Sequence, residues 1–552
     1  MTEQNMTPWQ RFIGLLQLDK RDVFQVFYYA IFSGIVALSL PLGIQAIINL
    51  IQGAQISTSW VVLVTLVTLG VAFSGALQLM QLRIIETIQQ RIFTRASFEL
   101  SYRFPKIKTS ELRNYYPPEL ANRFFDTLII QKGLSKILID VPAALLQILF
   151  ALLLLSFYHP FFIIFGILLL VLIFVVFKFT AKKGLRTSLI ESKNKYRVAH
   201  WIQEIARTMV SFKLSGNTSL ALEKNDTLVS DYLISREKHF KVLIVQFIQM
   251  IGFKVIVTAS LLLIGGALVL NQEMNIGQFV AAEIIILLVI ASVEKLILGL
   301  ESFYDVLTSI EKIGQIVDKE LEDQEGEKPF FKDNLDIEFD QVSYVVPNRE
   351  LPMIDSVSFK INIKSRVLIL GESGAGKSTL LQLISGINEP TSGHIYINNL
   401  SINSLNLNHY RAQLGLSLTE ETPFEGSIRD NLTFGNPNIT DDEIYEVFEK
   451  VGLTSFIKEQ NKGLKTILYP DGKQMSHTVS KKLVLARAIL KKPKLLILED
   501  ALDRFNPVET NSIINYLTHK DRTWALIVVS GSDSWKTKCN KIIQLEKGHI
   551  KN

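Results

Sequence analysis

Six long apolar runs in the first 300 residues constrain the fold of this chain more than any other feature. Each run is long enough to cross the hydrocarbon core of a bilayer as a helix. The runs cover residues 23–50, 60–82, 137–157, 161–179, 242–270 and 276–300. The mean hydropathy of +0.25 is high for a soluble protein, and the apolar excess lies before residue 300. The sequence therefore predicts an all-α six-helix transmembrane domain over residues 1–317.

The segments between these runs alternate in length and in charge. The connections near residues 51–59, 158–160 and 271–275 are short and contain no Lys or Arg, whereas residues 83–136 and 180–241 are long and rich in both. Because basic residues are retained on the cytoplasmic side of a membrane, we expect both long segments and both termini to be cytoplasmic.

The two long cytoplasmic segments have helical character of their own. Residues 83–104 and 184–205 keep a helical apolar period, so we expect the spanning helices to continue beyond the bilayer. Residues 116–123 and 209–216 are typical of short transverse turns that can dock on a soluble domain. The amphipathic stretch Pro8–Leu18 is expected to lie along the membrane interface.

Four ionisable residues fall inside the predicted spans: Lys254, Glu283, Glu294 and Lys295. A charge at such depth is costly and usually faces a cavity or a partner. Two interpretations stay open at this point. The four side chains either line a translocation path, or they pair with each other and snorkel to hold the helices together.

Cysteine content and charge exclude several classes of protein. The single cysteine, Cys539, excludes an intrachain disulfide and a cysteine-based metal cluster. The net charge of +5 is mild, and its basic residues lie between apolar runs, which favours a membrane lipid surface over nucleic acid. No cleavable signal peptide is expected, because the N-terminus is polar and the first apolar run is long enough to span.

A second domain is expected after a charged stretch. Residues 318–335 combine charges with Gly and Pro and are typical of a linker, so we place the second domain at 336–552. It opens with three strand-like segments at 336–339, 342–346 and 356–361.

A phosphate-binding loop follows these segments and fits the pattern G-x-x-x-x-G-K-[ST]. Its nine residues are Gly371, Glu372, Ser373, Gly374, Ala375, Gly376, Lys377, Ser378 and Thr379. The glycines let backbone N–H groups point at phosphate oxygens. Lys377 adds a positive charge near the β- and γ-phosphates, and the Ser378 hydroxyl suits Mg²⁺. A buried strand at Arg366–Leu370 precedes the loop and a helix at 378–385 follows it, which argues against an accidental glycine-rich turn.

Two later apolar segments complete the expected site. Residues 495–498 read as a buried strand that ends in Glu499 and Asp500, and residues 525–529 read as another. Acids at the end of such a strand, beside a phosphate loop, hold Mg²⁺ and nucleotide. The sequence therefore predicts an α/β P-loop nucleotide-binding domain that takes ATP and Mg²⁺, with Ser378 and Glu499 on the metal and Asp500 near the reacting phosphate.

The whole pattern resembles a half-transporter of the ATP-binding cassette (ABC) exporter family, over nearly the full chain. The family's helix after its signature motif is recognisable at Ala486, Arg487 and Ala488. The first half is similar to bacterial exporters of the type I secretion and bacteriocin kind, whose amino-terminal peptidase domain is not expected here. The resemblance implies a homodimer or heterodimer, the bacterial inner membrane, a cytoplasmic ATP-binding domain and a secretion adaptor as a further partner to test.

The resemblance also implies roles for two residues outside the phosphate loop. Tyr344 stands where the family places the aromatic that stacks on adenine; the alternative is a strand tyrosine packed in the sheet. The family's Leu-Ser-Gly-Gly-Gln signature, which contacts the ATP held by the partner subunit, is replaced at 475–479 by Met-Ser-His-Thr-Val. Of that motif only Ser476 is retained.

Four further positions depart from the family pattern. Thr419 stands where a glutamine senses the γ-phosphate, and Asn506 stands where an aspartate is usual. The Asp-Glu pair that closes the strand is inverted to Glu499-Asp500, and the switch histidine is replaced by Gly531.

These departures affect hydrolysis more than binding. Hydrolysis needs a base within about 3 Å of the attacking water, and donors on the charge that develops in the transition state. We therefore expect an ATP-driven exporter subunit with weakened hydrolysis. The alternative is a non-hydrolysing regulatory or structural subunit, or a nucleotide-gated channel. A membrane-anchored enzyme with a soluble substrate is a weaker third reading, because six spans exceed what an anchor needs. The transported substrate stays open.

Overall fold

The computed structural model describes residues 6–52, 58–113, 115–331, 335–346, 349, 351–362 and 364–551; the side chains at 172, 173 and 175–181 lie outside the described part. The chain divides into two compact units. The first unit combines Met1–Lys106 with Leu112–Lys319, and the second combines Ile107–Glu111 with Glu320–Asn552.

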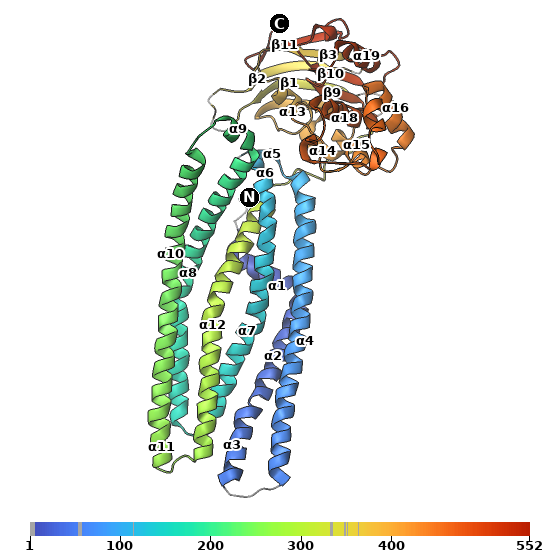
Figure 1. Cartoon of the computed structure of the whole chain (residues 1–552). Coiled ribbons are helices and arrows are strands. Elements are labelled where there is room, and N and C mark those ends of the chain that lie inside the picture. Colours follow the sequence, from blue (N-terminus) through green and yellow to red (C-terminus); the bar gives the residue numbers. More distant parts are fainter. Residues whose placement is uncertain are drawn as a thin grey trace. The chain divides into compact units, whose positions relative to one another are not determined.

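The first unit is built from helices (Figure 1). They are α1 (Pro8–Leu18), α2 (Lys20–Ala37), α3 (Ser39–Gln52), α4 (Thr58–Arg103), α6 (Pro117–Asn122), α7 (Asp126–Ser156), α8 (Phe161–Arg207), α9 (Met209–Leu214), α10 (Leu220–Ser260), α11 (Gly266–Leu270) and α12 (Ile276–Val317), with α5 (Thr109–Leu112) at the boundary of the two units.

Five helical stretches among the described residues are long and apolar enough to cross a membrane. They are Lys20–Gln52, Thr58–Lys106, Pro117–Ser156, Leu220–Leu270 and Ile276–Val317. These stretches contain five of the six predicted spans. The other predicted span, 161–179, lies in α8; its described apolar part is Phe161–Val171, and most of the remainder is outside the described side chains.

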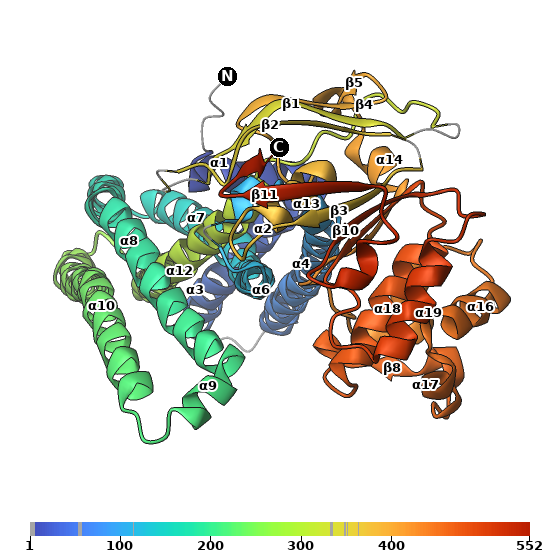
Figure 2. The ribbon, with the colours of Figure 1, turned by 90° about the horizontal axis from the view of Figure 1, so that it is seen from above.

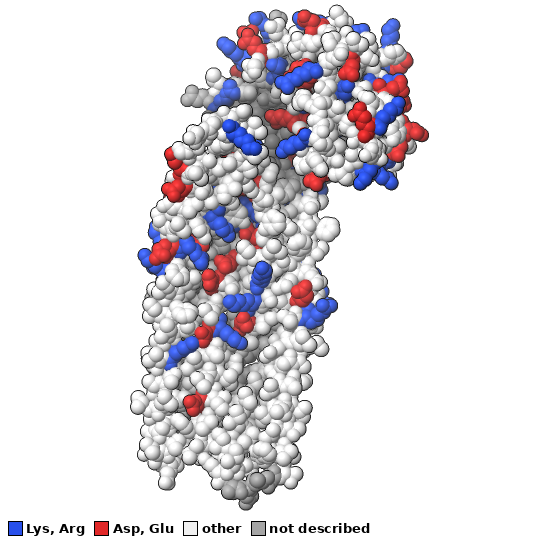
Figure 3. All heavy atoms as spheres, in the orientation of Figure 1, with Lys and Arg blue, Asp and Glu red and all other residues white. Residues whose placement is uncertain are grey.

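Several helices are much longer than a bilayer requires. Helix α4 has 46 residues and α8 has 47, which corresponds to roughly 70 Å at 1.5 Å per residue. The hydrocarbon core needs only about 30 Å, so the predicted continuation beyond the bilayer is confirmed as helix. The two predicted transverse turns correspond to the short helices α6 and α9. On the face drawn in Figure 3, charged side chains are sparse at the end of this unit that carries α3 and α11.

Close helix packing and one ion pair hold the first unit together. A Cβ atom added to Gly133 on α7 would lie 2.3 Å from Val306 Cγ2 on α12, so only glycine permits this approach. Lys254 Nζ on α10 lies 2.5 Å from Glu294 Oε2 on α12. For these two charges the contact supports the pairing interpretation, while the roles of Glu283 and Lys295 stay predictions.

The second unit contains a four-stranded antiparallel sheet and a six-stranded, mostly parallel sheet. The first has the order β2-β1-β4-β5, from β1 (Ile337–Tyr344), β2 (Ile354–Ile361), β4 (Ser392–Ile397) and β5 (Leu400–Ser401). The second has the order β12-β11-β3-β10-β9-β6, from β3 (Arg366–Leu370), β6 (Leu414–Ser417), β9 (Leu495–Glu499), β10 (Ala525–Val529), β11 (Lys541–Glu546) and β12 (His549–Lys551). A short pair joins β7 (Gly426–Ser427) and β8 (Ile467–Leu468).

Alternate side chains of the six-stranded sheet enter two different cores. Val367 and Ile369 pack with α13 (Lys377–Ile384) and the antiparallel sheet, whereas Leu368 packs on the opposite face. That opposite face is covered by α15 (Ile428–Thr433), α16 (Asp441–Val451), α17 (Thr454–Lys458), α18 (His477–Leu490) and α19 (Pro507–Leu517). Figure 2 shows α16 to α19 gathered on one side of the sheet, away from β1, β2, β4 and β5. With both faces covered, the carboxyl ends of β3 and β9 are left to form a site.

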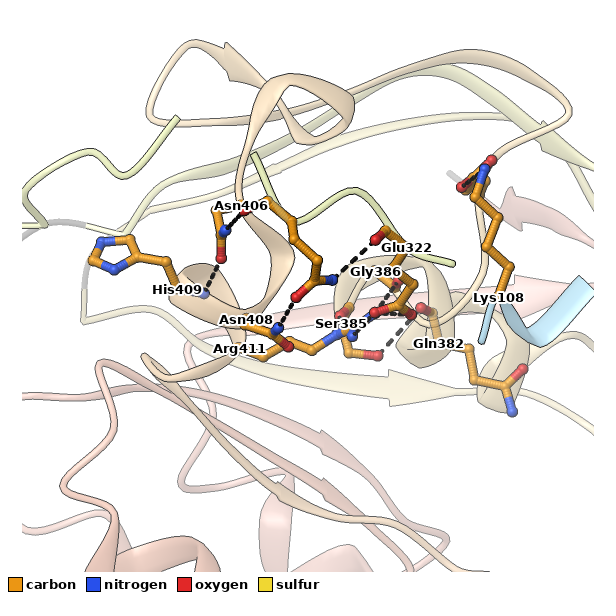
Figure 4. Close-up of polar contacts among 11 residues, drawn as sticks. Lys108, Glu322, Gln382, Ser385, Gly386, Asn406, Asn408, His409 and Arg411 are labelled. Carbon is orange, nitrogen blue, oxygen red and sulfur yellow. Dashed lines mark hydrogen bonds and ion pairs between the residues drawn. The ribbon is translucent and has the colours of Figure 1, made fainter. Parts of the chain in front are cut away.

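The stretch expected as a linker packs on the second unit (Figure 4). Arg411, at the end of α14 (Leu407–Arg411), donates to the two Glu322 carboxylate oxygens at 2.6 and 2.9 Å. Asn406 Nδ2 donates to the Gln324 carbonyl at 2.6 Å. Glu320 and the residues after it thus belong to the second compact unit, together with Ile107–Glu111. The composition predicts a solvated, charged linker here. In the structure, charged residues of this stretch form ion pairs with the domain instead.

Candidate nucleotide-binding site

The predicted phosphate loop connects β3 to α13. Gly374 and Gly376 have φ values of +82° and +100°, which side chains other than glycine rarely adopt. A Cβ atom on Gly376 would lie 2.6 Å from the Met353 carbonyl oxygen. These positions need glycine, because the backbone must turn tightly and pass close to its neighbour. The backbone N–H groups at the start of α13 are thereby available to an anion.

Lys377 lies across the loop that precedes it. Its Nζ donates to the carbonyl oxygens of Gly371 and Glu372, both at 2.8 Å. The ammonium is therefore held at the mouth of the cradle, beside the N-terminus of α13. A phosphate chain entering this loop meets the lysine charge and the helix N-terminus together.

Of the two acids predicted to close the site, Glu499 is the last residue of β9 and Asp500 follows it directly. Glu499 is 7 % exposed, and its Oε2 accepts from the Thr419 backbone N–H at 3.2 Å. Asp500 has a φ of +46°, and its N–H donates to the Val529 carbonyl at 2.9 Å. Burial and the nearby Asp503 and Glu499 carboxylates raise the pKa of Asp500 above its ordinary value.

One cavity of about 340 Å³ contains most of the predicted site. It is lined by Met353, Ser373, Gly374, Gly376, Lys377, Ser378, Thr379, Gln382, Leu418, Thr419, Glu420, Glu499 and Asp500. Residues separated by more than 100 positions in the sequence, Lys377 and Glu499, thus meet at one edge of the sheet. The structure brings together the loop and the acids, as predicted.

The donor set suits magnesium bound together with phosphates. The Ser378 hydroxyl and the Glu499 and Asp500 carboxylates line the same cavity. Mg²⁺ usually takes one or two protein carboxylates and completes its shell with substrate phosphates and water. Within the part of the chain that the structure describes, no group of three or more His, Cys, Asp or Glu residues forms an all-protein metal cage. The residues present therefore fit Mg²⁺ that arrives with a nucleotide.

Comparison with known proteins agrees with this geometry. Residues 354–503, which include the phosphate loop and both acids, match the family described as ABC transporter. The chain carries an ABC transporter domain. The whole chain also has the fold of an ABC exporter. It superposes on a bacterial Atm1-family ABC exporter with ATP bound at a TM-score of 0.84, covering 97 % of this chain and 94 % of that one, with 16 % sequence identity.

Two curated relatives of the chain are named as translocation ATP-binding proteins. The alpha-hemolysin translocation ATP-binding protein HlyB of Escherichia coli O157:H7 is 28 % identical over 305 residues, which is 55 % of this chain and 43 % of HlyB. The toxin RTX-I translocation ATP-binding protein of Actinobacillus pleuropneumoniae is 29 % identical over 309 residues, which is 55 % of this chain and 43 % of that protein. The chain spans about half the length of these relatives.

Five predicted residues are not among those that line the cavity of the ABC domain: Gly371, Glu372 and Ala375 of the phosphate loop, and Tyr344 and Ser476. Tyr344 ends β1, is 4 % exposed and packs in the core of the antiparallel sheet, where a packed strand tyrosine was the alternative. Its contact with adenine stays a prediction. Ser476 is the N-cap of α18, and its Oγ accepts from the Val479 N–H at 3.3 Å. A role for Ser476 at the partner's nucleotide needs a second subunit and also stays a prediction.

At positions that depart from the family pattern, the side chains of Thr419 and Asn506 make local hydrogen bonds, whereas Gly531 has no side chain to make one. Thr419 lines the cavity, and its hydroxyl donates to the Glu499 carbonyl at 3.3 Å. Asn506 is the N-cap of α19 and accepts from Val508 N at 2.9 Å. At Gly531, no described atom apart from those of its chain neighbours lies within 4 Å of the place where a Cβ would be, so there is open space beside the backbone.

Sequence reasoning missed Lys481, on α18. Its Nζ donates to the carbonyl oxygens of Leu418, Thr419 and Glu421. The signal in the sequence is weak: two adjacent lysines, Lys481 and Lys482, directly precede the apolar run 483–486. Both are 5 % exposed, and each donates hydrogen bonds to a segment distant in the sequence.

Proposed function

We propose that this chain is one subunit of a dimeric ATP-driven exporter in which ATP hydrolysis is weakened. The observation that carries the proposal is the single cavity in which the Lys377 cradle and the Glu499–Asp500 pair meet. Among its described residues, the same chain has five helical stretches that are long and apolar enough to cross a membrane. A nucleotide site fused to so many spans is suited to coupling nucleotide binding to movement of the spans.

The residues of this chain divide the chemistry among them. Bound ATP with Mg²⁺ supplies the phosphoryl group and the charge that neutralises it. The loop backbone and Lys377 hold the phosphates, and the Ser378 hydroxyl and Glu499 present oxygens to the metal. We assign Asp500, which lines the cavity beside Glu499, as the candidate base for a water. It is one methylene shorter than the glutamate of the family pattern, so its carboxylate reaches less far from the backbone.

Transition-state stabilisation is the weaker part of the site. Removing one donor to the developing charge typically costs about 10²–10³ in rate. Gly531 offers no side chain, and His477 and Thr478 replace two glycines of the signature motif. Slow hydrolysis with intact binding follows from this combination.

The second candidate function is a non-hydrolysing ATP-binding subunit that regulates or supports a partner. The joint substitution at Thr419, His477, Asp500 and Gly531 favours it. The acids gathered at the phosphate loop favour the ATPase, because a purely structural nucleotide site has no need of a second carboxylate at the reacting end. The two candidates differ in whether turnover depends on Asp500.

Lipid and a second half-transporter are the partners we propose. The apolar window of α4 has no buried residue within this chain, so lipid or another subunit must cover it. We place the protein in a bacterial inner membrane with the ABC domain in the cytoplasm. Two relatives named for toxin translocation make a polypeptide the first cargo to test, together with a secretion adaptor.

Photolabelling with an ATP analogue tests the nucleotide site. Lys377→Ala removes the main positive charge of the cradle, and we expect it to abolish labelling in lipid nanodiscs. Lys360→Ala is the matched control, because Lys360 pairs with Glu338 on the surface, at 3.2 Å, and does not line the nucleotide cavity. Labelling of Lys377→Ala equal to wild type would show that the nucleotide binds elsewhere.

A further inference from the structure

Lys481 is a buried cation that holds a loop at the wall of the nucleotide cavity. It lies on α18, four residues into the helix that begins after Ser476, and is 5 % exposed. Its Nζ donates to the Leu418 carbonyl at 3.1 Å, to the Thr419 carbonyl at shorter range and to the Glu421 carbonyl at 3.4 Å. An ammonium with three carbonyl partners is satisfied as a donor, but its charge is not cancelled by them.

The loop that Lys481 holds is part of the cavity wall. Leu418, Thr419 and Glu420 line the cavity, and the Thr419 N–H donates to Glu499 Oε2 at 3.2 Å. A continuous chain of contacts therefore runs from Lys481 through Thr419 to the carboxylate that would hold the metal. The lysine fixes the carbonyl side of the loop, so that the N–H side stays directed at Glu499.

The charges around the cavity call for a cation. Glu420, Glu499 and Asp500 line the cavity, Glu421 and Asp503 lie near enough to act on Lys481 and Asp500 respectively, and a nucleoside triphosphate adds more negative charge. Burial lowers the pKa of Lys481, and the negative charges of Glu421, Glu499 and Asp500 oppose that shift. Burial and the Asp503 and Glu499 carboxylates raise the pKa of Asp500, and the positive charges of Lys377 and Lys481 oppose that rise.

We propose that Lys481 is a built-in counter-cation of the nucleotide site, which lets a nucleoside triphosphate bind beside Glu499 and Asp500 before Mg²⁺ is present. The proposal rests on the proposed ATP site. Lys481 is a positioning residue: it touches neither phosphate nor metal, and it acts through the 418–421 loop and through its charge. Its removal should therefore matter most when no Mg²⁺ is present to balance the acids.

A matched control is the next residue in the same helix. Lys482 is also 5 % exposed, but its Nζ donates to the Gly452 carbonyl at 3.1 Å and to Glu509 Oε2 at 3.1 Å. Neither Gly452 nor Glu509 lines the nucleotide cavity. Lys482→Met thus removes a buried lysine from α18 without changing the charge beside the acids.

The test is the affinity for a fluorescent ATP analogue in nanodiscs, measured once with Mg²⁺ and once with EDTA. For Lys481→Gln and Lys481→Met we expect an affinity loss about tenfold larger in EDTA than in Mg²⁺, as for one unscreened charge at short range. Lys482→Met should change both affinities by the same factor. The amide of Lys481→Gln can still donate a hydrogen bond to the loop, so this variant removes only the charge. It therefore keeps the test valid if Lys481→Met fails to fold.

Three results would contradict the proposal that Lys481 is a counter-cation. They are equal losses in Mg²⁺ and EDTA for Lys481→Gln, no loss in either condition, and a wild type that binds the analogue only with Mg²⁺. Failure of the ATP site itself gives a different pattern: the wild type shows no saturable binding in any condition, or Lys377→Ala binds as tightly as wild type.

Discussion

At the scale of single residues, the backbone conformation at position 500 restricts which acid fits there. A φ of +46° places this residue in the left-handed region, which Asp and Asn adopt more readily than other side chains. The inverted order Glu499-Asp500 therefore suits the local turn, because the shorter acid occupies the strained position. The sequence shows the inversion but not the conformation that makes aspartate favourable there.

We predict that Asp500→Glu does not restore an ordinary ATPase rate. Glutamate adopts the left-handed backbone conformation of this position less readily than aspartate. In addition, Gly531 and the 475–479 motif remain altered. Phosphate release in nanodiscs should stay within about tenfold of wild type, well below the usual enzyme range of about 1–10³ s⁻¹. Asp503→Glu is the control, since Asp503 is a neighbouring exposed acid that is not among the positive-φ residues. A rate inside the enzyme range for Asp500→Glu would contradict this account.

At the scale of elements, α13 is held at both ends. Its N-terminus carries Lys377, and beyond its C-terminus Arg411 donates to the Ser385 carbonyl at 3.1 Å and to the Gly386 carbonyl at 2.6 Å (Figure 4). The same guanidinium holds Glu322 in the segment before β1. One side chain thus fixes both the phosphate-binding helix and the start of the ABC domain.

We predict that Arg411→Leu loosens this part of the domain. The Arg411 and Glu322 side chains are 20 % and 10 % exposed, and removing one partner of such a pair leaves a poorly solvated charge. The cost should be about 3 kcal/mol, or roughly 10²-fold faster amide hydrogen exchange. The faster exchange is expected in residues 320–331 and the end of α13.

Lys360→Leu provides the comparison for Arg411→Leu. The Lys360 and Glu338 side chains are 50 % and 45 % exposed, so their pair contributes at most about 1 kcal/mol. Exchange in residues 320–331 should match wild type in this variant. Unchanged exchange in Arg411→Leu as well would mean that the Arg411–Glu322 pair does not hold the segment.

Elements with a local signal could be predicted, and elements fixed by distant contacts could not. The strands predicted at 495–498 and 525–529 are present as β9 and β10, because continuous apolar runs mark buried parallel strands. The segments 336–339 and 342–346 are one bulged strand, β1, with Gln341 at a φ of +48°. Strand β11 has mostly exposed side chains and no such run. The contact from Lys481 to the 418–421 loop joins residues about 60 apart and leaves no local trace.

At the scale of the whole molecule, charge and apolar length decide the topology. Five described stretches are long and apolar enough to span, and in the sequence the Lys- and Arg-rich segments alternate with short connections that contain no Lys or Arg. The sixth span and the turn at 53–57 lie partly or wholly outside the described residues. Cargo and oligomeric partner are not encoded in a local pattern, because they depend on surfaces shared with other molecules.

We predict that a membrane-impermeant maleimide applied from outside labels Gln272→Cys and spares Lys213→Cys. Both positions are exposed in the structure, so a difference in labelling reports the side of the membrane. The native Cys539 gives little background, because burial raises the pKa of its thiol to about 11 and thiolate is scarce at neutral pH. Permeabilised cells should label Lys213→Cys. Labelling of Lys213→Cys in intact cells would contradict the six-span topology.

The central claim is that the isolated protein binds MgATP but turns it over slowly. The direct measurement is analogue photolabelling and phosphate release on one nanodisc sample of wild type, with Asp500→Asn beside it. We predict saturable labelling that Lys377→Ala abolishes, together with phosphate release below about 1 s⁻¹. A wild-type rate of about 1–10³ s⁻¹ that Asp500→Asn abolishes would contradict the claim, since Asp500 would then be a fully competent base in its own setting.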